Sequence, residues 1–346
     1  MKRLGSIGLG LVGLTLVLVC GTCFAGTPGL HLAKRATLKA GAPVRALAFG
    51  PGGHHAYLAR DNELLAYDTA TAQSEENLNL HGPIVDLAMD PAHAKGYALL
   101  ASPVRLVSFG LQPLRLLRQQ KLDGGTGLLY DGRIDAVFVE NAQDATLAKF
   151  NAASGHHLGT LHLSGTLGQM AIDQRGTLYV ADSVHDAIDA VDEAHMTALD
   201  AIPLSGCKGP SGLAMDPVGR RLFVGCADGM RAVVDTDMGF TFEELPSSLR
   251  GASRMVFAFH PFGADGWKGA AIGVGANGQL ALIRMLAFVK YVAAGDDTLP
   301  GDCEAMALNP TTHQLWLAVG EKSVDTDGAN GAVELWMLGQ ATGATP

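Results

Sequence analysis

The chain has 346 residues, with 25 Lys and Arg against 34 Asp and Glu, and its formal net charge is −9. Nucleic acid and anionic lipid repel such a surface at long range, so this charge argues against both as partners. The 44 glycines fit a fold with many turns, and the chain contains no low-complexity linker and no long amphipathic helix.

The first 25 residues have the pattern of a secretory signal peptide. Lys2 and Arg3 are positive, Leu9–Val19 is an apolar run, and Cys23 and Ala25 place small residues at a cleavage site. The run is too short to cross a membrane comfortably, which favours cleavage over an uncleaved anchor. The cleaved chain carries 23 basic and 34 acidic residues, a formal charge of −11. We therefore expect a periplasmic or secreted protein that is not embedded in a membrane.

A five-residue phrase then recurs seven times: an apolar residue, usually Ala, another apolar residue, a polar residue or Gly, and often Pro. Successive copies start 40 to 49 residues apart, at Leu47, Leu87, Leu128, Met170, Leu213, Phe257 and Met306. A fixed period in this range, with strand-like content, is typical of β-propellers. About 320 residues remain after cleavage, which is enough for one large closed array with an extensive core.

Each phrase begins a group of four short strands. About ten residues on, a second strand carries an aromatic residue in six copies: Tyr57, Tyr97, Phe138, Tyr179, Phe223 and Trp316. An apolar third strand and a more polar fourth strand follow, such as residues 64–68 and 159–163. Four antiparallel strands of this kind make one propeller blade. The predicted blades start near residues 43, 83, 125, 166, 210, 252 and 302.

The seventh group lacks a fourth strand, whereas residues 30–41 form a strand-like piece ahead of the first phrase. The economical solution is that this piece becomes the outer strand of blade seven, which closes the ring and removes an open edge. The competing prediction is an open solenoid. The sequence therefore predicts an all-β, seven-bladed propeller of four-stranded antiparallel blades over residues 26–346, a single domain.

The fourth and fifth repeats carry a family resemblance. Gly176–Asp182 reads GTLYVAD, and Pro210–Pro217 reads PSGLAMDP, with Arg220–Cys226, RRLFVGC, after it. These stretches resemble the YVTN-type β-propeller repeats, which overlap with NHL repeats and include exported bacterial proteins. The resemblance covers essentially the whole cleaved chain and implies the fold. It implies less about chemistry, since such propellers include both binding proteins and enzyme-like relatives.

Three cysteines survive cleavage. Cys207 precedes the first strand of blade five and Cys226 ends its second strand, so both are expected on one face, 19 residues apart. In an oxidising compartment this favours a structural disulfide over a metal or redox role, and such a bond contributes about 3 kcal/mol. Cys303 is expected on the same face, two blades away, as a buried thiol.

The predicted ligand site lies at the mouth of the central channel. The loops between fourth and first strands share a face with those between second and third strands, and this face usually holds the ligand. The candidate ligand-binding residues near the channel are Arg45, Asp86, Gln169, Lys208, Arg254 and Glu304. The alternative interpretation is that most are ordinary solvated loop residues.

The sequence leaves two candidate functions, one a binding role and the other an enzymatic activity. The leading prediction is a non-enzymatic, exported binding or scaffold protein, a monomer without a cofactor, that presents its loop face to a small molecule or a protein. The alternative is a lactonase-like hydrolase with a divalent metal at the channel mouth, held by oxygen ligands from Asp182, Asn277, Asp302 and Glu304. No HExxH, CxxCH or GxSxG motif occurs, so the sequence predicts no catalytic residue.

Overall fold

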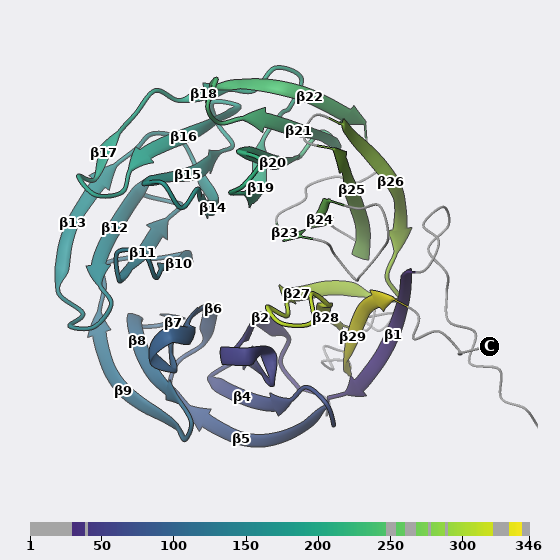
Figure 1. Cartoon of the computed structure of the whole chain (residues 1–346). Coiled ribbons are helices and arrows are strands. Elements are labelled where there is room, and N and C mark those ends of the chain that lie inside the picture. The colour runs from purple at the N-terminus through teal and green to yellow at the C-terminus, as the bar shows by residue number, and fades with distance from the viewer. Residues whose placement is uncertain are drawn as a thin grey trace, which may run out of the picture.

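Seven antiparallel sheets stand around one axis in the computed structural model, as Figure 1 shows. The structure describes residues 30–38, 41–246, 254–259, 268–275, 278–287, 290–320 and 332–340. The predicted signal peptide lies outside these residues. Within them, no helix has the length and apolar character needed to cross a bilayer. The all-β, seven-bladed propeller predicted from the repeats is thereby confirmed.

Each blade runs outward from the axis in chain order. The inner strands are β2 (Val44–Phe49), β6 (Ile84–Asp90), β10 (Gly127–Asp131), β14 (Leu167–Ile172), β19 (Pro210–Asp216), β23 (Arg254–Phe259) and β27 (Asp302–Leu308). The second strands are β3 (His55–Arg60), β7 (Lys95–Ala101), β11 (Ala136–Asn141), β15 (Thr177–Asp182), β20 (Arg221–Cys226), β24 (Gly269–Val274) and β28 (Leu315–Gly320).

The outer half of each blade is built in the same way. The third strands are β4 (Glu63–Asp68), β8 (Val104–Leu111), β12 (Thr146–Asn151), β16 (Ala187–Asp192), β21 (Met230–Asp235), β25 (Gln279–Ala287) and β29 (Val333–Gln340). The outer strands are β5 (Gln73–Asn79), β9 (Leu114–Lys121), β13 (His157–His162), β22 (Phe240–Pro246) and β26 (Lys290–Thr298), with two short pieces, β17 (Thr197–Ala198) and β18 (Ile202–Pro203), in blade four.

The ring closes through the N-terminal strand. β1 (Leu30–Thr37) pairs antiparallel with β29, with Leu32 opposite Leu338 and Thr37 opposite Glu334. Blade seven therefore has the order β27, β28, β29, β1, and β1 lies beside β29 in Figure 1. This is the closure that the sequence predicts, and it leaves blade seven with the same number of strands as its neighbours.

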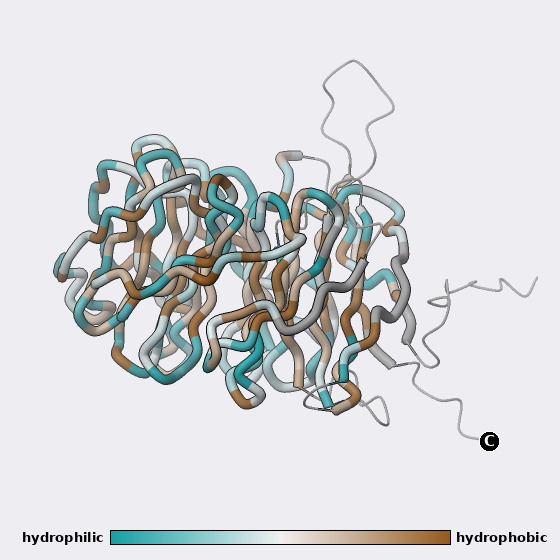
Figure 2. Tube along the Cα trace, turned by 90° about the horizontal axis from the view of Figure 1, so that it is seen from above, coloured by the Kyte–Doolittle hydropathy of each residue, from teal (hydrophilic) through white to brown (hydrophobic). Residues whose placement is uncertain are grey.

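The apolar core lies between the blades. The described residues form seven hydrophobic clusters, and each of them joins two adjacent blades. The six aromatics predicted on the second strands are all buried within them: Tyr57, Tyr97, Phe138, Tyr179, Phe223 and Trp316. Seen from the side in Figure 2, hydrophilic residues gather in the loops at both ends of the strands. Burial between neighbours explains why the inner strands are apolar on both faces.

In most of the repeated phrases the fourth residue is an Asp or Asn, and its side chain closes the turn that follows the inner strand. Oδ1 of Asp173 accepts hydrogen bonds from the amides of Arg175, Gly176 and Thr177 at 2.7 to 3.1 Å. Asp216 and Asn309 do the same for two amides each. These buried side chains satisfy the turn's backbone donors, so the polar end of the phrase belongs to the scaffold.

Candidate functional site

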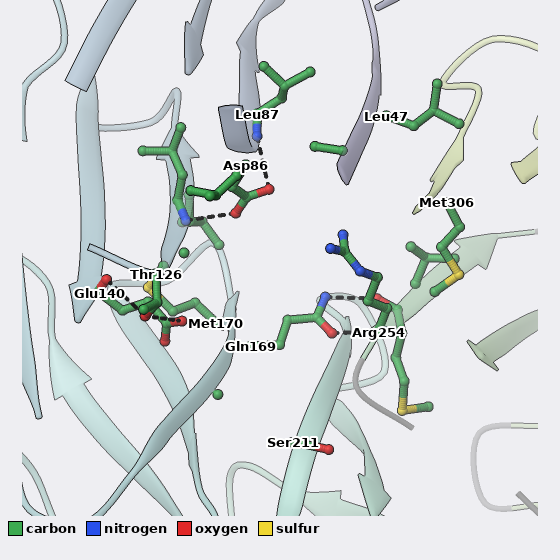
Figure 3. Close-up of a pocket in the computed structure, with 18 residues that line it drawn as sticks. Leu47, Asp86, Leu87, Thr126, Glu140, Gln169, Met170, Ser211, Arg254 and Met306 are labelled. Carbon is green, nitrogen blue, oxygen red and sulfur yellow. Dashed lines mark hydrogen bonds between the residues drawn. The ribbon is translucent and has the colours of Figure 1, made fainter. Parts of the chain in front are cut away.

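A cavity of about 470 Å³ occupies the ring's central channel, at the end where the inner strands begin. All seven inner strands contribute to its wall. Its polar side chains include Asp86, Thr126, Glu140, Gln169 and Arg254, shown as sticks in Figure 3. Apolar side chains such as those of Leu47, Met170 and Met306 fill the spaces between them.

Backbone bulges recur where the inner strands enter this cavity. The pairing between the first and second strands shifts by one residue in blades one, two, five and seven, and a shift also occurs in blade four. The extra residues include Arg45, Gln169 and Glu304. A bulge re-aims the side chain that it carries, and bulges gather next to functional sites. Of these three residues, Gln169 lines the cavity.

Two of the channel side chains join neighbouring blades. Oδ1 of Asp86 accepts a hydrogen bond from the amide of the next residue, Leu87. Oδ2 accepts one from the amide of Leu128 in blade three at 2.8 Å. The amide of Gln169 crosses from blade four to blade six, where it donates to the carbonyl oxygen of Met255 and accepts from the Met255 amide, both at 2.9 Å. Gln169 also accepts from the amide of Leu213 in blade five. Both side chains therefore fix the blades around the channel.

Arg254, Arg45 and Glu304 lie around the contact between blades six, seven and one. Arg254 donates from Nη2 to the carbonyl oxygen of Arg45 at 3.0 Å, and its guanidinium points into the cavity in Figure 3. Glu304 accepts from the amide of Val44 at 2.7 Å. Burial raises the pKa of Glu304, and that hydrogen bond and the nearby Arg45 oppose the rise. Arg45 itself is exposed.

Glu140 reaches the channel from the second strand of blade three. Its partner across the sheet is Gly127, and a Cβ on Gly127 would lie 2.5 Å from Oε1 of Glu140. The glycine therefore leaves the space in the inner strand through which the carboxyl passes. Oε1 accepts from the Thr126 hydroxyl at 3.4 Å, whereas Oε2 is buried without a hydrogen-bond partner.

The carboxyl groups of Asp86 and Glu140 share a poorly hydrated wall. Burial, reinforced by the nearby Asp86 carboxylate, raises the pKa of Glu140 to about 8. Burial also raises the pKa of Asp86, while Arg254 and the two backbone amides hold it down. Glu140, with a pKa of about 8, is therefore largely protonated at neutral pH. Glu140 is not among the six candidates from the sequence, and Gly127 opposite it is the first residue of β10.

Lys208 lies away from the cavity. Its side chain is 71% exposed and its Nζ bonds Oδ2 of Asp186 at 2.7 Å, on the loop that leads into blade five. The same loop contains the Cys207–Cys226 disulfide, whose Cα atoms are 5.4 Å apart. Both cysteines are fully buried, as a structural bond requires. Cys303 is a free thiol but half-buried rather than buried, and removal from water raises its pKa to about 12.

The four residues of the metal hypothesis are placed as follows. Asp182 is buried, and its oxygens bond the amides of Val184 and His185 and the His185 ring. Asp302 is exposed at the start of β27, and Asn277 lies outside the described residues. In the part of the chain that the structure describes, one cluster brings three ligand atoms within 4.8 Å, and it consists of Asp90, His93 and Asp135.

That cluster includes none of the four predicted ligands. Asp90 is engaged by the amide and the ring of His93, the same turn geometry that Asp182 and Asp192 form with His185 and His195. The side chains described around the channel include carboxyl, amide, hydroxyl and guanidinium groups but no histidine, lysine or cysteine. This set is suited to holding a polar ligand by charge and hydrogen bonds.

No family model matches the chain, and no curated protein matches it by sequence. Many solved structures are similar to it in fold, including those of U3-55K and RRP9. The structure of U3-55K is 10% identical, with a TM-score of 0.71 over 89% of this chain and 98% of that one. The WD40 repeats of RRP9 are 10% identical, with a TM-score of 0.72 over 90% and 97%. At such identity the likeness shows the fold alone, and that fold is the seven-bladed propeller of the WD40-repeat structures.

Proposed function

We propose that this protein is a non-enzymatic binding propeller that holds a small polar ligand at its channel mouth. The observation that carries this proposal is the cavity of about 470 Å³, to which every blade contributes and into which charged groups of both signs point. Pockets of this size, with a few polar groups in an apolar wall, are typical of small-molecule sites. The seven-bladed scaffold holds these groups on rigid strands.

Export is part of the same proposal. The pattern of the first 25 residues and the resemblance to YVTN-type repeats support a periplasmic or secreted binding protein. The buried Cys207–Cys226 disulfide agrees with an oxidising compartment. Mass spectrometry of the protein recovered from the periplasm or medium tests this, with an N-terminus at residue 26 as the expected result.

Ligand binding is tested by blocking the channel. Ser211 lines the cavity, so Ser211→Trp fills it, whereas Ser74→Trp adds the same bulk to the exposed strand β5. A panel of small polar metabolites is screened by thermal shift, and both variants are first checked for a native circular dichroism spectrum. We expect ligands that raise the Tm of the wild type and of Ser74→Trp but not of Ser211→Trp. A panel without such a compound contradicts the proposal.

A further inference from the structure

One polar atom of the channel wall stands apart from the hydrogen-bond network that joins the blades. Oε2 of Glu140 is buried and has no hydrogen-bond partner among the described residues, and Glu140 itself is 6% exposed and lines the cavity. A buried oxygen left without a partner costs about 1–3 kcal/mol. Because Glu140 lines the cavity, a ligand there is one partner that could offset this cost, and a side chain at position 127 would crowd the Glu140 carboxyl.

A cation is fixed on the other side of the same cavity. Arg254 comes from blade six, whereas Asp86 and Glu140 come from blades two and three. Within the residues that the structure describes, its guanidinium makes one hydrogen bond, from Nη2 to the carbonyl oxygen of Arg45, and Nε and Nη1 make none. Carboxyl groups from blades two and three and a guanidinium from blade six thus line one cavity, as Figure 3 shows.

We infer that the channel binds a small zwitterion of the amino-acid class, with its ammonium group at Glu140 and Asp86 and its carboxylate at Arg254. This inference rests on the proposed binding function and names the ligand class. An ammonium group donates to the Glu140 carboxyl, whose Oε2 has no partner among the described residues, and lies beside the Asp86 carboxyl. Arg254 presents the N–H groups that pair with a carboxylate. The aliphatic part of the ligand lies against the methionine and leucine side chains of the wall.

Binding of the ammonium end is coupled to a proton. Two groups face the Glu140 carboxyl, Asp86 from β6 and the Thr126 hydroxyl ahead of β10, and Arg254 from β23 acts in turn on Asp86. An ammonium ligand favours the ionised form of Glu140, whose pKa in the empty channel is about 8. Affinity therefore rises with pH from 6 to 8, by up to about tenfold per pH unit, and levels off above that.

The first experiment uses isothermal titration calorimetry to compare zwitterions with compounds that carry only the ammonium or only the carboxylate group. The probes are the ω-amino acids from glycine to 6-aminohexanoate, with pentylammonium and pentanoate as half-ligands. We expect at least one ω-amino acid to bind at least tenfold more tightly than either half-ligand. If no ω-amino acid exceeds the half-ligands, the zwitterion inference is wrong.

Variants assign the two ends. Glu140→Gln keeps the shape of the side chain and removes its charge, and Glu63→Gln is the matched control on β4. Near pH 8.5 we expect Glu140→Gln to bind the ω-amino acid and pentylammonium at least tenfold more weakly than wild type. Near pH 6, where Glu140 is protonated, the affinities of Glu140→Gln and of the wild type should agree within about threefold. A purely structural role would weaken binding equally at both pH values, which would overturn the assignment.

Arg254 is tested by Arg254→Gln and by the conservative Arg254→Lys. We expect Arg254→Gln to weaken binding of the ω-amino acid and pentanoate about tenfold and to affect pentylammonium much less, with partial rescue by Arg254→Lys. Equal losses for both half-ligands contradict the proposed orientation.

The inference and the proposed function fail in different ways. Suppose that the channel binds another panel compound, that Ser211→Trp abolishes this binding, and that no ω-amino acid binds. The zwitterion ligand class is then refuted, whereas the proposed binding function stands. If no compound depends on Ser211, both are refuted.

Discussion

At the scale of single residues, a glycine decides which carboxyl groups the channel contains. Glu140 belongs to a second strand, one layer behind the wall, and it reaches the cavity only because Gly127 has no side chain. Burial then raises its pKa to about 8, while its partner Asp86 receives two backbone hydrogen bonds. The difference between the two carboxyls follows from their surroundings, since their chemistry is the same.

Glu140→Gln should change how stability depends on pH. The pKa of Glu140 is about 8 in the folded protein against an ordinary 4.5, so between these values the folded chain holds a proton that the unfolded chain has lost. This contribution is fully present near pH 4.5 and is lost as pH rises through 8. We expect urea titrations to show wild-type stability falling by a few kcal/mol relative to Glu140→Gln, roughly between pH 5 and 8. Parallel pH profiles would contradict this.

Part of the channel could be predicted from the sequence. The positions just ahead of each phrase place Asp86, Gln169 and Arg254 at the channel, because the repeat itself positions the start of every inner strand. Glu140 depends on its register against Gly127, and sequence spacing does not fix that register. Lys208 has a favourable position in the repeat, yet an ion pair with Asp186 directs its side chain away from the axis.

At the scale of elements, the turn after an inner strand is closed by the residue that ends the phrase. Asn309 closes its own turn through two amides and also donates from Nδ2 to the carbonyl oxygen of Gly53 in blade one at 2.8 Å. Asp68 closes a similar turn after a third strand through the amides of Ala70 and Thr71, and it is much more exposed. One repeated device thus serves both turn formation and contact between blades.

Alanine substitutions at these two turns should differ in cost. Asn309→Ala removes buried hydrogen bonds within its turn and to the next blade, so we expect a loss of about 2 to 3 kcal/mol. Asp68→Ala removes a more exposed cap, so we expect a clearly smaller loss. Chemical denaturation of both variants measures the difference. An equal loss in the two would show that the contact with Gly53 contributes nothing measurable.

The repeated turns are the element that sequence predicts best, since the polar residue and the backbone that it caps are only two to four positions apart. The bulges at the start of the inner strands are not predictable in the same way. They arise from pairing between strands, and their residues, such as Arg45, Ser211 and Glu304, share no residue type.

At the scale of the whole molecule, closure joins residues far apart in the sequence. β1 pairs along its length with β29, and Leu32 and Leu38 add to two of the clusters between blades. The sevenfold count could be predicted from the repeated phrase. The closing strand could be predicted because the sequence lacks a fourth strand at its C-terminal end and has an extra strand at its N-terminal end. The fold is therefore largely determined by the repeat, whereas the ligand is not.

Removal of residues 26–37 should open the ring. Without β1, the hydrogen-bonding edge of β29 is exposed and Leu32 no longer packs in its cluster. We expect a Tm lower by several degrees and self-association that rises with protein concentration, because an open strand edge pairs with other chains. Light scattering and thermal unfolding measure both. A monomeric truncated chain with the wild-type Tm would show that closure is dispensable.

The arrangement of the core affects how related propellers can diverge in ligand selectivity. Because the seven apolar clusters lie between blades, few of the channel's polar side chains take part in them, and a substitution on the wall can change the ligand while the packing that defines the ring persists. Rings of the same shape with only 10% identity are what such freedom permits. Among relatives of this chain, selectivity is therefore expected to diverge position by position along the axis, with Gly127 as a single site at which one mutation excludes or admits a carboxyl group.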